Sequence, residues 1–406
     1  LKVKYKNGYY IATADATTYM TKTIKKVAKM TVTMFDTGKK VRDKMHNLMS
    51  EGTISKDSNY SCDVSIDAIE KYNGVPDLTK LTEANIISLE ESSFPIYMWA
   101  EKSGKTEIRN IYGETNLTEE NEYNKRGETG TIYWWSESNS VYLNPDSSQM
   151  FAVLPYLTNI DGLKDMKTDY VVDMSKMFFS LGTQLGNIDA LSGWNTSKVE
   201  NMDGMFYTWG SLLTNVNALA NWDTSKVKDM SNMFAGNGNL TNIDGLRNWN
   251  TSNVTNMHEM FGGSDSVGCG FTSLSAISNW DVNNVTDMSN MFYGCHKLKD
   301  ISGIWNWNIT EIASNMFFDC CALANITIPS TVIKIREAFS MCDLEKVKIF
   351  VTDANKFEVE SNAFNDLASN SKIYVLSEEI KAKLEGSYDT SKTTVEVVTL
   401  DQMNNL

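Results

Sequence analysis

The chain has 406 residues, of which 42 % are hydrophobic, and it carries 51 acidic and 37 basic side chains, a formal net charge of −14. That apolar content is normal for a packed globular protein and excludes an intrinsically disordered one. The length exceeds one ordinary domain and fits two or three. No apolar run approaches the roughly 20 residues of a membrane span. Six cysteines in a chain of this size cannot form a disulfide framework.

The charge is distributed unevenly along the chain. Residues 1–50 hold 11 basic and 3 acidic side chains, so the remaining residues carry −22. An acidic body argues against binding to phosphate backbones, and we expect no nucleic-acid partner. The basic segment is either a solvated helix face or a means of attachment to an anionic surface. Because the sequence begins with Leu1, we expect a native export signal or anchor to have been removed.

Residues 1–147 predict a small α+β region, of which residues 1–60 contain no repeat. Its last strands are expected to cap the repeats that follow, because an uncovered first repeat would be an open edge. The polar stretch over 101–130 predicts a hairpin with a long acidic tip. In chain order, we expect a helix that Asp15 caps, a strand over 30–35, a helix from Val41 that Gly52 ends, and strands at 60–66, 96–99 and 132–135.

The central part of the chain is an internal repeat. The pair Met-Phe recurs at spacings of 25 to 31 residues, at 150–151, 177–178, 205–206, 233–234, 260–261, 291–292 and 316–317. Between these pairs an apolar residue stands at every third position and leads to a tryptophan, at Trp194, Trp222, Trp249, Trp280 and Trp307. Units this small cannot bury their own apolar residues, whereas stacked units bury one another's. The pattern predicts buried ladders of Phe and Met, of Leu and Ile, and of Trp.

Polar residues recur in register as well. Segments such as Asn195-Thr196-Ser197 predict turns at the corners of each unit. A second polar row follows the central apolar residue, and it predicts turns or solvent-facing positions rather than a calcium site, because some rungs are Asn or Ser. This row consists of Asp161, Asp189, Asn217, Asp244, Ser275 and Ser302.

The repeat resembles a known family. The sequence Asn-Trp-Asp-Thr-Ser-Lys-Val-Lys-Asp-Met-Ser-Asn-Met-Phe at 221–234, repeated with variation over about 148–375, is similar to the bacterial BspA-like leucine-rich repeat surface proteins. Asp-Gly between Ile243 and Leu246 leaves one residue more than the shorter family unit, and we expect a strand bulge to absorb it. The resemblance implies an exported protein displayed on the cell surface and used in attachment, and it supplies no catalytic residues.

The expected fold class is a mostly β leucine-rich-repeat solenoid, with stacked coils of about 27 residues and a small N-terminal α+β region. We divide the chain into an α+β region and cap over 1–147, the solenoid over 148–375 and a C-terminal cap over 376–406. In the last part, Ser377 is expected to cap a helix through Leu384, Gly386 to end it, and 393–400 to form a final strand.

Residue patterns for chemistry are missing from the sequence. It has no His-based zinc motif, phosphate loop or nucleophile elbow, so we expect no enzyme, no cofactor and no metal site. Cys295, Cys320 and Cys342 each follow the Phe of a repeat, and they predict a row of buried, reduced thiols; a bridge between Cys320 and Cys342 is the alternative.

We expect a monomeric binding module whose solenoid face docks a host or matrix protein or a glycan. The alternative is a structural spacer that holds another domain, such as 1–147, away from the cell wall. Small polar residues between the first two apolar rungs of successive units form the expected binding face. Its candidate residues are Thr214, Asn215, Thr241, Asn242, Lys299 and Asp300.

Overall fold

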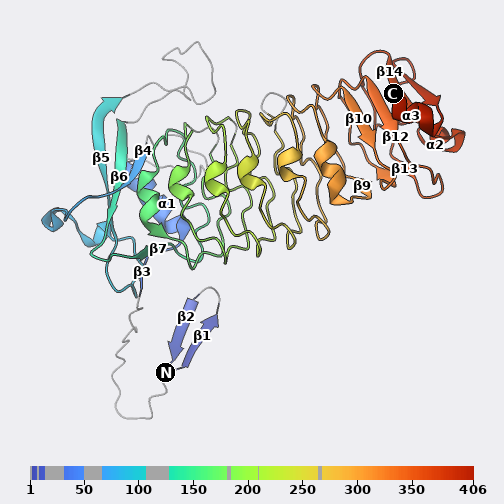
Figure 1. Ribbon diagram of the computed structural model, residues 1–406. Coiled ribbons are helices and arrows are strands. Elements are labelled where there is room, and N and C mark those ends of the chain that lie inside the picture. The colour runs from blue at the N-terminus through green and yellow to red at the C-terminus, as the bar shows by residue number, and fades with distance from the viewer. Residues whose placement is uncertain are drawn as a thin grey trace.

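The computed structural model describes residues 2–6, 9–13, 32–49, 66–106, 128–180, 184–208, 210–263 and 268–406. Successive repeats lie side by side in one long row, which runs from the strands near residue 66 to the strands near the C-terminus (Figure 1). A single hydrophobic core extends from Phe35 to Val395 through this row. The expectation of a β-rich repeat protein is therefore confirmed.

The N-terminal elements are short. They are β1 (Lys2–Lys6), β2 (Tyr9–Thr13), β3 (Thr33–Met34), α1 (Gly38–Met49), β4 (Ile66–Lys71), the 3₁₀ turns Leu78–Lys80 and Glu83–Asn85, β5 (Tyr97–Thr106), β6 (Glu128–Trp135), β7 (Val141–Tyr142) and β8 (Met166–Lys167). The predicted second helix is confirmed as α1, which buries Val41, Met45 and Met49. The helix expected after Asp15, residues 60–65, Gly52 and the tip over 107–127 lie outside the described residues.

The first repeat is covered by a three-stranded sheet in the order β4-β6-β5, in which β5 and β6 form the predicted hairpin. Strand β4 extends the row of repeats, because the Ile69 amide donates to the Asn159 carbonyl at 3.0 Å. The indole of Trp134 donates to the Gly162 carbonyl at 3.2 Å. The tryptophans of the later repeats donate to the repeat before them, whereas Trp134 donates to the repeat after it, so this indole joins the sheet to the first repeat.

The repeats between 148 and 310 are joined by single parallel bridges rather than by continuous strands. Examples are Asn201 with Asp229 and Asn215 with Asn242. Asx side chains accept the amide two residues ahead, as Asn201 does from Asp203 at 2.9 Å, and these turns end the extended segments. A 3₁₀ turn follows in each repeat: Asp161–Asp165, Asp189–Leu191, Asn217–Leu219, Asp244–Leu246, Ser275–Ile277 and Ser302–Trp307.

The expected strand bulge at Asp244-Gly245 is wrong, because both residues belong to one of these 3₁₀ turns. The turn packs closely on the preceding repeat: a Cβ at Gly245 would lie 2.1 Å from the Val216 carbonyl oxygen. Only glycine allows this approach. The expectation that the Asp and Ser row forms turns is confirmed, since each of its members opens a 3₁₀ turn.

The predicted phenylalanine ladder is confirmed. Phe234 is 1 % exposed and stacks on Phe206 and Phe261, with ring centroids 5.6 and 5.7 Å away. The same stacking continues in both directions, from Phe151 to Phe364. One aromatic ring per repeat at one position is what keeps successive repeats in register.

Toward the C-terminus the repeats acquire true strands: β9 (Glu311–Ile312), β10 (Asn325–Ile328), β11 (Lys334–Ile335), β12 (Lys346–Ile349), β13 (Glu358–Val359), β14 (Ser371–Val375) and β15 (Thr393–Val397). They form two parallel sheets, β10-β12-β14-β15 and β13-β11-β9. The alternating apolar residues of β10 and β12 face the core and form part of the ladders.

Two helices complete this end of the molecule. Helix α2 (Glu378–Lys383) begins after Ser377, whose hydroxyl accepts the Ile380 amide, and Gly386 follows with a φ of +81°, as predicted. The final strand ends earlier than expected, because Thr399 and Gln402 form a capping box for α3 (Leu400–Asn405). Among the described residues, no helix has the length and apolar content to cross a membrane.

Candidate ligand-binding surface

The six predicted binding-face residues lie at the contacts within two pairs of neighbouring repeats. The amides of Thr241 and Asn242 both donate to the Thr214 carbonyl, at 3.0 and 3.1 Å. In the next pair, the amides of Lys299 and Asp300 donate to the Thr272 carbonyl, at 2.9 and 3.1 Å. Thr214, Thr241 and Lys299 are exposed, so each of the two pairs of repeats presents polar side chains at the surface of the stack.

The other predicted face residues have a structural role. Asn215, Asn242 and Asp300 accept the amides two residues ahead, at 3.2, 2.8 and 2.8 Å, and thereby open the 3₁₀ turns. Partial burial raises the pKa of Asp300, but hydrogen bonds from Ser302 and Ser273 outweigh this effect and hold that pKa below its usual value. These Asx side chains are therefore engaged in turns, whereas the Thr and Lys side chains lie exposed beside them.

The tryptophan row is not a glycan platform. Its members are 3–5 % exposed. The indole nitrogens of Trp194, Trp222 and Trp249 donate to carbonyls of the preceding repeat, at 3.2, 3.1 and 3.0 Å. The prediction that this row belongs to the core is confirmed, and its polar atoms are used to hold neighbouring repeats together.

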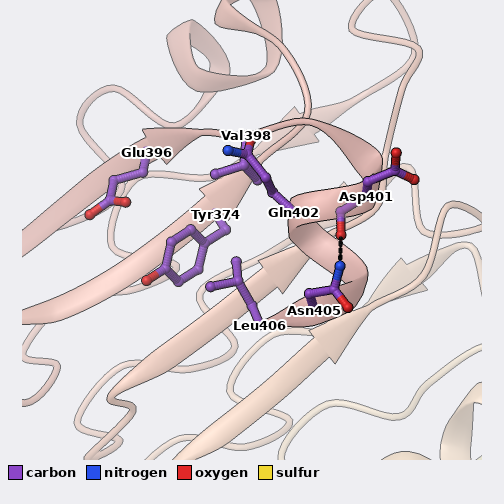
Figure 2. A pocket seen from close by; sticks show the side chains of 7 residues that line it. All are labelled: Tyr374, Glu396, Val398, Asp401, Gln402, Asn405 and Leu406. Atoms are coloured by element: carbon purple, nitrogen blue, oxygen red, sulfur yellow. Dashed lines mark hydrogen bonds between the residues drawn. The ribbon is translucent and has the colours of Figure 1, made fainter.

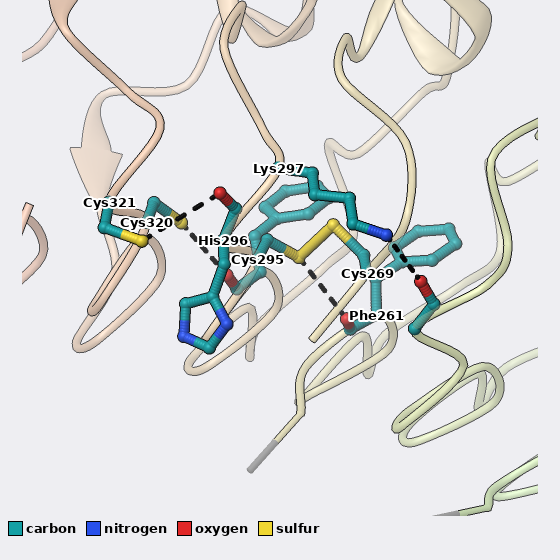
Figure 3. The surroundings of a disulfide bond; sticks show 9 residues. Phe261, Cys269, Cys295, His296, Lys297, Cys320 and Cys321 are labelled. Atoms are coloured by element: carbon teal, nitrogen blue, oxygen red, sulfur yellow. Dashed lines mark hydrogen bonds between the residues drawn. A yellow bond between two sulfur atoms is a disulfide. The ribbon is translucent and has the colours of Figure 1, made fainter. Parts of the chain in front are cut away.

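The cysteine row is buried as predicted, but it is not fully reduced. Cys295, Cys320 and Cys342 each direct the sulfur toward a Phe carbonyl of the preceding repeat. Cys295 forms a disulfide with Cys269 (Figure 3), so the prediction of a free thiol at Cys295 is wrong. The inserted loop that carries Cys269 passes very close to the turn before Cys295, which puts the two Cα atoms 4.7 Å apart.

The remaining buried thiols are poor nucleophiles. Burial raises the pKa of Cys320 well above its usual value, and it raises the pKa of Cys342 in the same direction. Both stay free in the structure, so the alternative bridge between them is not formed. A thiolate is the reactive species, and these sites suppress it.

The sequence did not reveal a cluster of three different donor side chains. His296 Nε2 lies 2.8 Å from Asp319 Oδ2, and the Cys321 sulfur lies within 4.8 Å of both. A signal was present: when the repeats are aligned on their Phe residues, His296 and Cys321 occupy the same position in successive units. Adjacent rungs of a stacked repeat lie side by side, so equal positions predict proximity.

A second surface group lies on the N-terminal sheet. The half-buried rings of Tyr72, Trp99 and Tyr133 have centroids 5.1 to 5.8 Å apart. Partial burial raises the pKa of Tyr133, and the carboxylates of Glu70 and Glu101 raise it further. Aromatic faces beside carboxylates are suited to sugar rings or cationic groups.

One shallow hollow lies between β15 and α3 (Figure 2). Its lining includes Tyr374, Glu396 and Gln402, and the Asn405 amide donates to the Asp401 carbonyl at 2.8 Å. Its polar groups do not converge on one point, which a small-molecule site requires.

The stacked rungs and the recurring leucine and isoleucine positions define a leucine-rich-repeat protein. Family models match two overlapping parts of the chain: "BspA type Leucine rich repeat region (6 copies)" at residues 270–398, and "Mycoplasma protein of unknown function, DUF285" at residues 145–220 and 209–330. The repeats over residues 270–398 are therefore of the BspA-like leucine-rich type that the sequence predicts. A search of curated proteins and a search of solved structures each gave no significant match.

Proposed function

We propose that the chain is a non-enzymatic, exported bacterial surface protein whose stacked repeats form a solenoid that binds a host or matrix protein or a glycan. The observation that carries this proposal is the exposed row of Thr214, Thr241 and Lys299, which stand at equivalent positions of three repeats. A rigid stack that presents small polar groups at regular intervals suits a broad contact surface. BspA-like membership is the support for export and surface display.

The core chemistry agrees with a binding role. The Phe side chains of successive repeats are buried and stack on one another, and the sulfurs of Cys295, Cys320 and Cys342 are buried as well. Their burial leaves recognition to the variable polar positions between the ladders. Contact spread over several repeats would give modest affinity per repeat and would require no deep pocket.

The alternative function is a spacer that displays residues 1–147. The aromatic group of Tyr72, Trp99 and Tyr133 favours this alternative, because it offers a ligand surface outside the repeats. In that case the repeats would contribute length and rigidity rather than affinity.

A pair of matched variants tests the proposal. Thr241 and Thr255 are both exposed, and each hydroxyl donates to a carbonyl of the preceding repeat, at 3.3 and 3.1 Å. Thr241 belongs to the proposed binding row. Thr255 lies outside it, next to Asn256 in the second row of bridges, which joins Asp229, Asn256 and Asp287. Retention on immobilised matrix proteins and glycans is measured for Thr241→Glu, Thr255→Glu and the parent chain.

The proposal predicts that Thr241→Glu weakens retention while Thr255→Glu does not. Binding should persist at high salt, since a purely electrostatic attachment through the basic N-terminal segment would be screened. If neither variant changes retention and Tyr133→Ala abolishes it, the spacer function is correct. Loss of binding in both threonine variants alike would exclude a contact confined to the first row.

A further inference from the structure

Two neighbouring repeats place an imidazole, a carboxylate and a thiol around one point. His296 follows Cys295 in one repeat, and Asp319 and Cys321 flank Cys320 in the next. His296 Nε2 and Asp319 Oδ2 are 2.8 Å apart, and these atoms and the Cys321 sulfur all lie within 4.8 Å of one another. The His296 and Asp319 side chains are 27 % and 20 % exposed, so a small ion can reach them from solvent.

These separations suit a tetrahedral ion after a small adjustment. With Zn–N and Zn–O bonds of about 2.0–2.2 Å and a Zn–S bond of about 2.3 Å, ligand atoms in a tetrahedron lie about 3.3–3.6 Å apart. Side-chain rotation that opens the His296–Asp319 contact and brings the sulfur inward by about 1 Å would reach this arrangement. We propose that His296, Asp319 and Cys321 form a site for Zn²⁺ or a similar borderline cation, with water as the fourth ligand.

The mixture of donors selects the kind of ion. Calcium takes six to eight oxygen ligands, so a site with one carboxylate, one imidazole and one thiol does not suit it. Nitrogen and sulfur donors together favour zinc and its neighbours. The negative charge of Asp319 attracts a cation, which would replace the proton of the Cys321 thiol on binding.

The backbone fixes the ligands in relation to one another. Asp319 adopts a left-handed conformation with a φ of +57°, and its amide donates to the Ser340 carbonyl at 2.9 Å. The Cys321 sulfur contacts the His296 carbonyl at 3.9 Å (Figure 3). A bound ion would therefore join two repeats just beyond the Cys269–Cys295 disulfide, and it would stabilise their stacking.

His258 provides a matched control. Its Nδ1 contacts Ser289 Oγ at 2.8 Å, and its Nε2 lies 3.7 Å from Glu259 Oε2. Like His296, it is half-buried and near a carboxylate, but it is not part of the one three-donor group found among the described residues. His258→Ala should not alter metal binding.

The test uses the full chain without an affinity tag, freed of metal by a chelator, and titrated with ZnCl₂ by calorimetry. The parent chain and His258→Ala should bind one equivalent, and His296→Ala and Cys321→Ser should each bind about 100-fold more weakly or not at all, because each removes a direct ligand. Circular dichroism establishes that the variants are folded. CaCl₂ should not compete.

Cobalt gives a second readout. Co²⁺ bound in the zinc position should produce a thiolate-to-cobalt absorption band in the parent chain, and Cys321→Ser should lack that band. Zn²⁺ should also slow alkylation of Cys321. A folded parent chain that binds no zinc, or a Cys321→Ser variant that binds zinc as tightly as the parent, would overturn the proposal.

Discussion

Replacement of Phe234 by alanine tests whether stacked aromatic rings hold the repeats together. The ring is 1 % exposed, lies between Phe206 and Phe261, and contacts Trp249 with centroids 6.4 Å apart. Truncation of a buried Phe costs about 3–5 kcal/mol. Two stacked partners are lost at once, and each aromatic pair adds about 0.5–1.5 kcal/mol, so we expect the upper half of that range.

The assay is urea denaturation followed by tryptophan fluorescence, with Phe94→Ala as the matched control. Phe94 is 42 % exposed, so its truncation should change the free energy of unfolding by no more than about 0.5 kcal/mol. Because repeat arrays need not unfold in one step, the midpoints of both variants are compared with the parent chain under one set of conditions. Equal midpoints for Phe234→Ala and Phe94→Ala would refute the stacking argument.

Three further predictions follow from local geometry. Gly245→Ala should destabilise the protein by about 1–3 kcal/mol, because the new methyl group overlaps backbone, whereas Gly193→Ala, with open space around its Cβ position, should be near neutral in the same thermal melts. Hydrogen bonds from the Ser225 hydroxyl and amide lower the pKa of Asp223. The contribution of Asp223 to stability is therefore complete above its ordinary pKa of about 3.9, and it is lost as the pH falls through the lowered folded-state value. Asp223→Asn should make acid unfolding less steep, and an unchanged pH profile would contradict this. Reduction of the Cys269–Cys295 disulfide should lower the melting temperature and release two thiols on counting in denaturant; counts that are equal with and without reductant would show that the bond does not form.

The sequence predicts the buried ladders well, because one apolar residue at one position in every unit has a single packing solution. Phe206, Phe234 and Phe261 illustrate this. The backbone between ladders is less predictable. The residue before each Met adopts a positive φ, for example +54° at Lys176, +56° at Asn232 and +52° at Glu259. Asn232 favours this conformation, as Gly and Asn do at the same position of other units, but Lys176 and Glu259 have no such preference, so there the conformation arises from the stacking.

The disulfide and the three-donor cluster could not be predicted either, because each depends on residues that do not recur in the repeats. Cys269 lies in an inserted loop whose path no periodicity specifies, so its disulfide with Cys295 could not be inferred from spacing. The cluster of His296, Asp319 and Cys321 is the one such group among the described residues. Because it does not recur, a comparison of the repeats shows each of its members only as a variable surface position. The exposed face was predicted as a set, but the use of Asn215 and Asn242 as turn acceptors required the structure.

We expect binding to be spread along the exposed row of a stack of equivalent repeats. Removal of residues 222–248 joins Asn221 to Trp249 and deletes one complete repeat in register, so that Phe206 would stack on Phe261. The affinity of this shortened chain for the ligand that the parent chain retains is the most direct measurement. We expect a folded protein whose affinity is reduced by a few-fold, because one of several contacts is lost. A folded protein with unchanged affinity, or with no affinity, would show that binding is not spread along the row.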